Sequence, residues 1–294
     1  MTATTRRPAG EPGTLLTTAP SADCTADSAG GLSFDVPLPG VAERWDAALL
    51  LRLRNSDPEE SVRLPLVPLS GGTGGTVLRA TLPSTVPLAE GRWDAYLVLG
   101  EEEPRRLLPG CNDLRSLVDR VPRTDRTWLG VRIPYATKYG NLSVRSWLRW
   151  PHAEVGEIWP EDGGVTVRGR LYGAPLASGA RLEARPRRAA GPVVTGPVDP
   201  AEGPGFTARL EYGDLARERE AGDDWELWLR PGADAEPVRV ARILDDIADK
   251  QKIVRYPARP AGGGKEGDGG LLARPYYTGA NDLSVRLERA SAAA

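Results

Sequence analysis

Residues 134–145 read PYATKYGNLSVR, and residues 275–286 read PYYTGANDLSVR. Seven of these twelve positions are identical at a shift of 141 residues. Upstream, GRWDAYL at 91–97 aligns with DDWELWL at 223–229 at a shift of 132 residues, in the same order along the chain. Two matches in one order predict that the chain contains two copies of one folding unit in tandem.

Between these motifs the chain consists of short apolar or alternating runs bounded by Gly, Pro and Ser, which is typical of β-strands. In one run, Val165, Val167 and Leu171 alternate with polar residues, as in a strand with one face in water. Turn signals recur about every 8–12 residues, the spacing of an all-β sandwich. We predict an all-β protein made of two tandem Ig-like antiparallel β-sandwiches. The expected strands include residues 45–54, 77–82, 93–99, 165–171, 206–210 and 225–229.

The N-terminal segment differs in composition from the rest of the chain. Residues 1–30 are mostly Thr, Ala, Pro, Ser and Gly, and such a segment cannot bury enough apolar surface to offset its ordering entropy. We therefore expect a disordered tail over 1–30, in which Cys24 is an exposed thiol. The remaining divisions are a first sandwich over 31–150, a second over 151–290 and a C-terminal tail over 291–294.

Each copy also contains a segment with helical spacing after its Trp motif. NDLRSLVDR at 112–120 begins with an Asn that can cap a helix and places Leu114, Leu117 and Val118 on one side. LDDIADKQK at 244–252 occupies the corresponding place in the second copy. We expect each segment to form one or two helical turns that cover one end of its sandwich.

Charge and hydropathy restrict the partners and the location. The chain has 294 residues with 38 Lys and Arg against 40 Asp and Glu, so it has no basic excess that would favour nucleic acid as a partner. No apolar run approaches the roughly 20 residues of a membrane span, and the first residues lack the apolar middle region of a signal peptide. These features predict a cytoplasmic protein with reduced cysteines, free or held peripherally at the inner face of the membrane through a partner.

Residues for catalysis or for a cofactor are scarce. The only histidine, His152, lies between the two copies, and with Cys24 and Cys111 it does not give the spacing of a metal site. The glycine runs at 71–75 and 262–270 lack the strand-loop-helix context of a phosphate-binding loop. We therefore predict no metal and no cofactor, and the sequence favours a non-enzymatic protein over an enzyme. The roles of His152 and of the two cysteines stay open.

The repeated Pro-Tyr motif is the candidate binding site. Tyr, Asn and Arg side chains at the edge of a β-sandwich are typical of a carbohydrate-binding surface. The alternative is structural, because Leu142 and Val144 alternate as inward positions, and Gly140 or Asn141 suits a turn with positive φ. The presence of the motif in both copies favours this structural interpretation. The candidate ligand-binding residues are Tyr135, Lys138, Tyr139, Asn141, Arg145, Tyr276, Tyr277, Asn281 and Arg286.

The strings LDDIADK at 244–250, RPYYT at 274–278 and NDLSVR at 281–286, with their weaker partners in 111–145, resemble a known family. They are similar to β-rich modules of actinobacterial cell-wall polymer systems, which are attached to or encoded beside glycosyltransferases and CDP-glycerol glycerophosphotransferases of the teichoic-acid type. The likeness covers about residues 31–290 and implies an accessory role in polymer synthesis. The transferases themselves have a two-lobed α/β catalytic part with essential histidines, which this sequence does not match, so the resemblance implies no catalytic residue.

Three functions stay open at this point. The first is a non-catalytic accessory protein that binds a cell-wall glycan or polyol-phosphate polymer, or docks onto a partner glycosyltransferase or glycerophosphotransferase. The second is a glycosyl- or glycerophospho-transferase in its own right. The third is a purely structural scaffold for protein interactions. Exposure of the rings of Tyr135, Tyr139, Tyr276 and Tyr277 would favour carbohydrate binding, and their burial would favour the scaffold.

Overall fold

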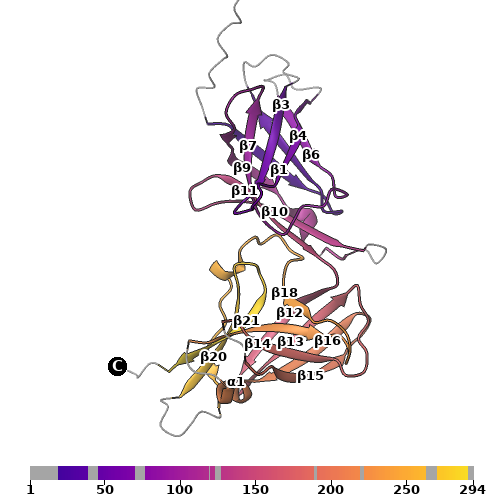
Figure 1. Cartoon of the computed structure of the whole chain (residues 1–294), viewed down its shortest axis with the longest axis vertical. Helices are drawn as coiled ribbons and strands as arrows, with labels where there is room; N and C mark the ends of the chain where they lie inside the picture. The colour runs from indigo at the N-terminus through magenta and orange to yellow at the C-terminus, as the bar shows by residue number, and fades with distance from the viewer. Residues whose placement is uncertain are drawn as a thin grey trace, which may run out of the picture.

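Strands dominate both halves of the chain, which lie one beyond the other along the long axis of the computed structural model (Figure 1). The described residues are 19–38, 46–69, 77–118, 120–122, 127–188, 191–218, 222–262 and 270–290. The first half ends with a strand at Arg149, and the second half begins with a strand at His152. Among the described residues, no helix has the length and apolar character needed to cross a bilayer.

The first half packs two sheets around one core. One sheet has the order β5-β6-β2-β1-β9, with β1 Ser21–Ala26, β2 Leu32–Pro37, β5 Val67–Pro68, β6 Val77–Leu82 and β9 Leu108–Asp113. The other has the order β10-β11-β7-β3-β4, with β3 Ala47–Leu53, β4 Ser61–Pro65, β7 Gly91–Leu99, β10 Leu129–Ala136 and β11 Leu142–Arg149; β8 Arg105–Arg106 pairs with β7. Alternate residues of both sheets point inward, and Phe34, Trp93 and Val144 lie fully buried between them.

The second half is a closed barrel of seven strands in the order β14-β15-β16-β13-β12-β18-β17, because β14 also pairs with β17. These strands are β12 His152–Glu161, β13 Gly164–Tyr172, β14 Arg181–Pro186, β15 Val194–Pro200, β16 Gly205–Glu211, β17 Asp224–Arg230 and β18 Val238–Ala241. Beyond β17 the sheet continues into β21 Leu283–Arg289, β20 Leu271–Tyr277 and β19 Arg259–Pro260. Trp225 and Phe206 lie in the barrel core.

The prediction of two tandem Ig-like sandwiches is therefore wrong. In the second half β15 pairs with both β14 and β16, and β17 pairs with both β14 and β18, so the strands form one ring and not two separate sheets. Sequence patterns do not separate these architectures, since residues alternate between core and solvent in a barrel strand as they do in a sandwich strand.

The two halves nevertheless share a pairing pattern. The set β3-β7-β11-β10 corresponds to β14-β17-β21-β20, and the parallel pair β1–β9 corresponds to β12–β18. The registers agree as well: Trp93 lies opposite Val144, and Trp225 lies opposite Val285. The halves differ where the single strand β15 replaces β4 and β5, which pair separately with β3 and β6. Descent of both halves from one duplicated unit stays a prediction.

The structure describes only the last part of the predicted tail, and there it finds a strand. Residues 1–18, like the expected C-terminal tail 291–294, lie outside the described residues. Residues 21–26, however, form β1 between β2 and β9, and Cys24 is buried there instead of exposed. Small residues such as Ala22 and Ala26 suffice in this strand because the neighbouring sheet supplies both the backbone partners and the larger core side chains.

Each of the two expected helical inserts contains one helical turn, at the lower end of the predicted one or two turns. These are the 3-10 turns η1 Arg115–Leu117 and η2 Lys250–Lys252, and the start of the first segment belongs to β9. Within the described ranges an α-helix, α1 Tyr212–Glu218, was not predicted. Its buried residues Tyr212, Leu215 and Ala216 have the i, i+3, i+4 spacing that was available as a signal.

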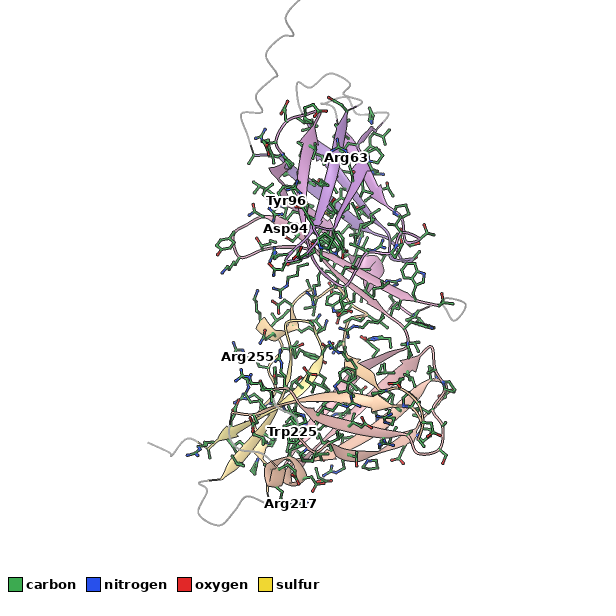
Figure 2. All side chains as sticks on the ribbon, in the orientation of Figure 1. Arg63, Asp94, Tyr96, Arg217, Trp225 and Arg255 are labelled. Atoms are coloured by element: carbon green, nitrogen blue, oxygen red, sulfur yellow. The ribbon has the colours of Figure 1, made fainter. Side chains whose placement is uncertain are left out.

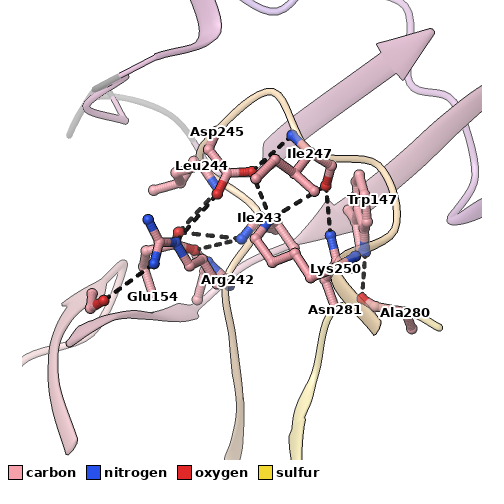
Figure 3. Close-up of polar contacts among 12 residues, drawn as sticks. Trp147, Glu154, Arg242, Ile243, Leu244, Asp245, Ile247, Lys250, Ala280 and Asn281 are labelled. Carbon is pink, nitrogen blue, oxygen red and sulfur yellow. Dashed lines mark hydrogen bonds and ion pairs between the residues drawn. The ribbon is translucent and has the colours of Figure 1, made fainter. Parts of the chain in front are cut away.

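The second half covers one end of the outer face of β10 and β11. The Trp147 indole donates a hydrogen bond to the carbonyl of Ala280 at 2.8 Å (Figure 3). Ile243 and Leu244, from the segment after β18, join the buried cluster of the first half. The Glu154 carboxylate accepts the backbone N–H groups of these two residues at 2.9 and 3.0 Å. The hydrogen bond of Trp147 and the burial of Ile243 and Leu244 therefore join the halves, and Glu154 holds the segment that supplies these two side chains.

The two thiols should react very differently in the folded protein. Burial, followed by the nearby charges of Asp23 and Asp35, raises the pKa of Cys24 to about 12, whereas Cys111 is exposed. A water-soluble disulfide reagent at neutral pH is expected to label one thiol per native chain and both thiols after denaturation. Cys111→Ser should abolish the native labelling; loss of that labelling in Cys24→Ser instead would contradict the position of β1.

Candidate functional site

The nine predicted site residues do not form a single cluster. Of the four tyrosines, Tyr139 is 77% exposed, Tyr277 is fully buried, and Tyr135 and Tyr276 are half-buried. The tyrosines therefore do not form a common platform for a sugar. The nine residues instead fall into two groups. Those in the second half are held by contacts within the protein, and those in the first half lie at a more exposed surface.

The second-half group holds the fold together. Tyr277 packs against Tyr256 with ring centroids 6.2 Å apart, and Arg286 is paired with Asp224 at 2.7 Å. Asn281 is buried: its side-chain amide donates to the carbonyl of Ile247 and accepts from the backbone of Lys250 (Figure 3). These side chains leave little free for a ligand.

Both motifs also form the same tight turn. Thr137 accepts two backbone N–H groups with its hydroxyl, from Tyr139 and Asn141, and Thr278 does the same for Ala280 and Asp282. The position of positive φ is Gly140 in the first turn, at 74°, and Asn281 in the second, at 60°. The motif therefore specifies the turn, as the structural interpretation proposed.

The first-half residues lie on or beside the outer face of the sheet β10-β11-β7-β3-β4. Directly opposite residues of an antiparallel pair share a face, and the register places Arg63, Leu50, Tyr96 and Arg106 in one row across this sheet. The next row contains Arg52, Asp94, Ser143 and Tyr135, and the third pairs Arg92 with Arg145. Figure 2 labels Arg63, Tyr96 and Asp94 on this half. We call the six arginines here, Arg52, Arg54, Arg63, Arg92, Arg106 and Arg145, together with Asp94 and Tyr96, the arginine face.

An aromatic ring and a carboxylate organise the centre of the arginine face. The guanidinium groups of Arg52 and Arg106 stack on the Tyr96 ring, 5.2 and 4.9 Å from its centroid. Asp94 accepts hydrogen bonds from Arg54 and, at 2.7 Å, from Ser143. Burial by itself raises the pKa of Asp94, but these hydrogen bonds and the charge of Arg106 outweigh burial and hold the pKa below its usual range.

Positive charge exceeds negative charge on the arginine face. Asp94 pairs with Arg54, and Glu59 pairs with Arg52 at 3.1 Å. Glu90, which is paired with Arg149, also acts on Arg145 through its charge, and Asp46 lies beside Arg63, so the six guanidinium groups still outnumber these four carboxylates. Among the described residues, Arg63, Arg92 and Arg145 have no ion-pair partner. Burial and then the charge of Arg92 lower the pKa of Arg145, as expected where cations crowd together. Arg63 is exposed and Arg92 is half-buried, so these two can meet an anionic group without first breaking an ion pair, whereas Arg145 is buried and stacks on Trp147.

The second half repeats the framework but neutralises it. Trp228 takes the place of Tyr96 and stacks with Arg185 and Arg239, at 5.2 and 5.0 Å. Glu226 corresponds to Asp94 and lies 3.7 Å from Arg187. Additional carboxylates pair with the other arginines of this face: Glu183 with Arg181, Arg185 and Arg230, Asp224 with Arg286, and Glu288 with Arg274. On the corresponding surface of the second half, these arginines are therefore already paired with carboxylates of the same surface.

Sequence reasoning identified Tyr135 and Arg145 but missed the centre of the arginine face. The sequence does contain a signal for it: Arg92, Asp94 and Tyr96 alternate with apolar residues in the Trp motif, which indicates an outward strand face of mixed charge. The excess of charge could not be seen along the sequence, because it arises from strands that pair across the sheet.

The remaining candidates for chemistry have structural surroundings. His152 is fully buried between the halves, with its Nε2 atom 2.7 Å from Glu154. The part of the chain that the structure describes contains no group of three or more His, Cys, Asp or Glu side chains that could hold a metal ion.

Comparisons with known proteins give no family. No protein-family model and no curated protein matches the sequence. Among solved structures, S. aureus TarS is 14% identical and has a TM-score of 0.29, with 70% of this chain and 38% of that chain covered. Its segment 217–571 gives the same identity and TM-score, with 65% and 55% covered. The chain thus spans less than two thirds of either structure.

Acid should weaken the arginine face through Asp94. A carboxylate whose folded pKa is lowered contributes stability that is fully present above its unfolded pKa, about 3.9, and is lost as the pH falls through the folded value. Asp94→Asn is expected to have a lower melting temperature than wild type at neutral pH and a smaller further loss between about pH 5 and 2. Asp162→Asn, an exposed site elsewhere, is the control. Parallel curves for wild type and Asp94→Asn would refute this role.

Proposed function

We propose that this protein is a non-catalytic accessory module that binds an anionic polyol-phosphate polymer of the cell wall through the arginine face. The observation that carries the proposal is the gathering of six guanidinium groups on one ordered sheet surface, where Arg63 and Arg92 have no ion-pair partner among the described residues. The whole chain has a net charge of −2, so this gathering of positive charge is local and not a property of the overall composition.

Guanidinium groups suit a phosphodiester ligand. Their planar N–H donors match two phosphate oxygens at once, and they are more weakly hydrated than lysine ammonium groups. Stacking on Tyr96 holds Arg52 and Arg106 in place before a ligand arrives, which reduces the entropy lost on binding. A repeating polyanion could contact several arginines of the face in succession.

The choice of polymer comes from the resemblance of the repeated motifs to modules of teichoic-acid-type systems. In such a system, the module would hold the growing or finished polymer near a partner glycosyltransferase or glycerophosphotransferase. The proposal therefore separates into a site, supported by the arginine face, and a ligand identity, supported by the motifs.

Binding to poly(glycerol phosphate), measured by calorimetry at several salt concentrations, tests the proposal. Wild type should bind with an affinity that falls as salt rises. Arg63→Gln combined with Arg106→Gln should weaken binding about 2- to 30-fold, since each exposed charged contact contributes roughly 0.2–1 kcal/mol. Asp94→Asn should strengthen binding if the fold is retained, because it releases Arg54 and Arg106.

Arg168→Gln is the matched control, because Arg168 also stacks on an aromatic ring, Trp159, at 5.0 Å but lies outside the arginine face. It should bind the polymer as wild type does, and neutral dextran should not bind at the arginine face. Equal loss in the control and in the double variant, or equal affinity for single-stranded DNA of the same charge, would reject a specific polymer site.

A further inference from the structure

A groove separates the two halves on the side of Trp228. Its volume is about 440 Å³, within the range of small-molecule sites, and such sites favour the boundary between two folding units. The first half and the connection contribute Glu90, Arg149, Trp150 and Pro151, and the strands β17 and β18 with their connection contribute Trp228 and Glu236. None of the candidate residues in the repeated tyrosine motif lines this groove.

We propose that this groove is a second binding site, which takes a neutral sugar ring of a glycan. Sugar rings present both apolar C–H faces and vicinal hydroxyl groups, so their sites combine aromatic walls with pairs of fixed polar groups. The groove offers both, and it does so with residues different from those of the arginine face.

The aromatic walls are held in place. Gly173 lies so close to the Trp150 indole that an added Cβ would be 2.4 Å from Cε2, so only glycine fits beside this ring. The guanidinium groups of Arg185 and Arg239 lie 5.2 and 5.0 Å from the centroid of the Trp228 ring and restrict its movement. Rigid indoles provide a large contact area with little loss of side-chain freedom on binding.

The polar groups are also fixed, and their charges balance. Arg149 is only 10% exposed and is held by Glu90 at 2.7 Å and by Asp282 at 2.6 Å. Of the groove-lining residues, Arg149 and Arg239 are balanced by Glu90 and Glu236. Hydrogen bonds from Arg149 lower the pKa of Glu90 although burial raises it, so the carboxylate stays an acceptor.

This balance determines the class of ligand. An anionic ligand would be repelled by the two carboxylates in the groove and would bind more favourably at the arginine face. A neutral polyol can instead donate hydroxyl hydrogens to carboxylates and accept from guanidinium groups without a net change of charge. The groove therefore fits an uncharged glycosyl unit better than a phosphate.

Titration with neutral tetrasaccharides of glucose and of N-acetylglucosamine, followed by tryptophan fluorescence and calorimetry, tests the site. At least one tetrasaccharide should bind saturably, and Trp228→Ala should weaken binding about fivefold or more. Glu236→Ala, at an exposed position of the groove rim, should weaken binding as well and serves if Trp228→Ala does not fold. The control is Trp159→Ala, which removes a 38% exposed indole outside the groove and should have no effect.

The two proposals fail separately. Sugar binding should be unchanged in the double variant Arg63→Gln with Arg106→Gln, and polymer binding should persist in Glu236→Ala. Absence of saturable binding to both tetrasaccharides, or an equal loss in Trp159→Ala and Trp228→Ala, would overturn the sugar site while leaving the arginine face untouched.

Discussion

The contact on which the rest of the structure depends is the burial of one end of β10 and β11 beneath the second half. There the Trp147 indole reaches the carbonyl of Ala280, and Ile243 and Leu244 enter the first-half core. This contact covers the apolar part of an outer sheet face and leaves the charged part open. It also fixes the spacing of the groove between the halves, so both proposed sites depend on it.

The same framework carries two different surfaces. A ring flanked by two arginines, with a carboxylate in the next row, occurs around Tyr96 and again around Trp228. In the second half, Glu183 and Asp224 supply further carboxylates, which pair with Arg230 and Arg286 and neutralise their charge. In the first half these positions lack the same compensation, and the charge remains available. A change in a few side chains, with a similar strand pairing, thus separates a surface whose arginines are paired with carboxylates from one on which some arginines stay unpaired.

Single strands and turns were predictable from the sequence, whereas the closing of the barrel and the identity of the neighbouring strands were not. Alternation identified the strands, and the motif around Gly140 and Asn281 identified two turns of positive φ. The barrel was not predictable, since a strand pairs on either side without altering its own period of two. The buried strand at Cys24 was missed because small residues in a polar segment become core only when larger neighbours cover them. Likewise, the arginine face combines residues that are up to 93 positions apart, from Arg52 to Arg145.

The different closure of the two halves also bears on aggregation. A ring of seven strands presents no free edge around its circumference, whereas the described first-half sheets end at β5 and β9 and at β4 and β10, and the outer backbone groups of β4 and β5 could template another strand. Pro65 in β4 and Pro68 in β5 each remove a backbone donor at these margins. Proline in these two end strands therefore opposes the addition of a strand from another chain. The barrel needs no such proline, because its ring of strands is closed.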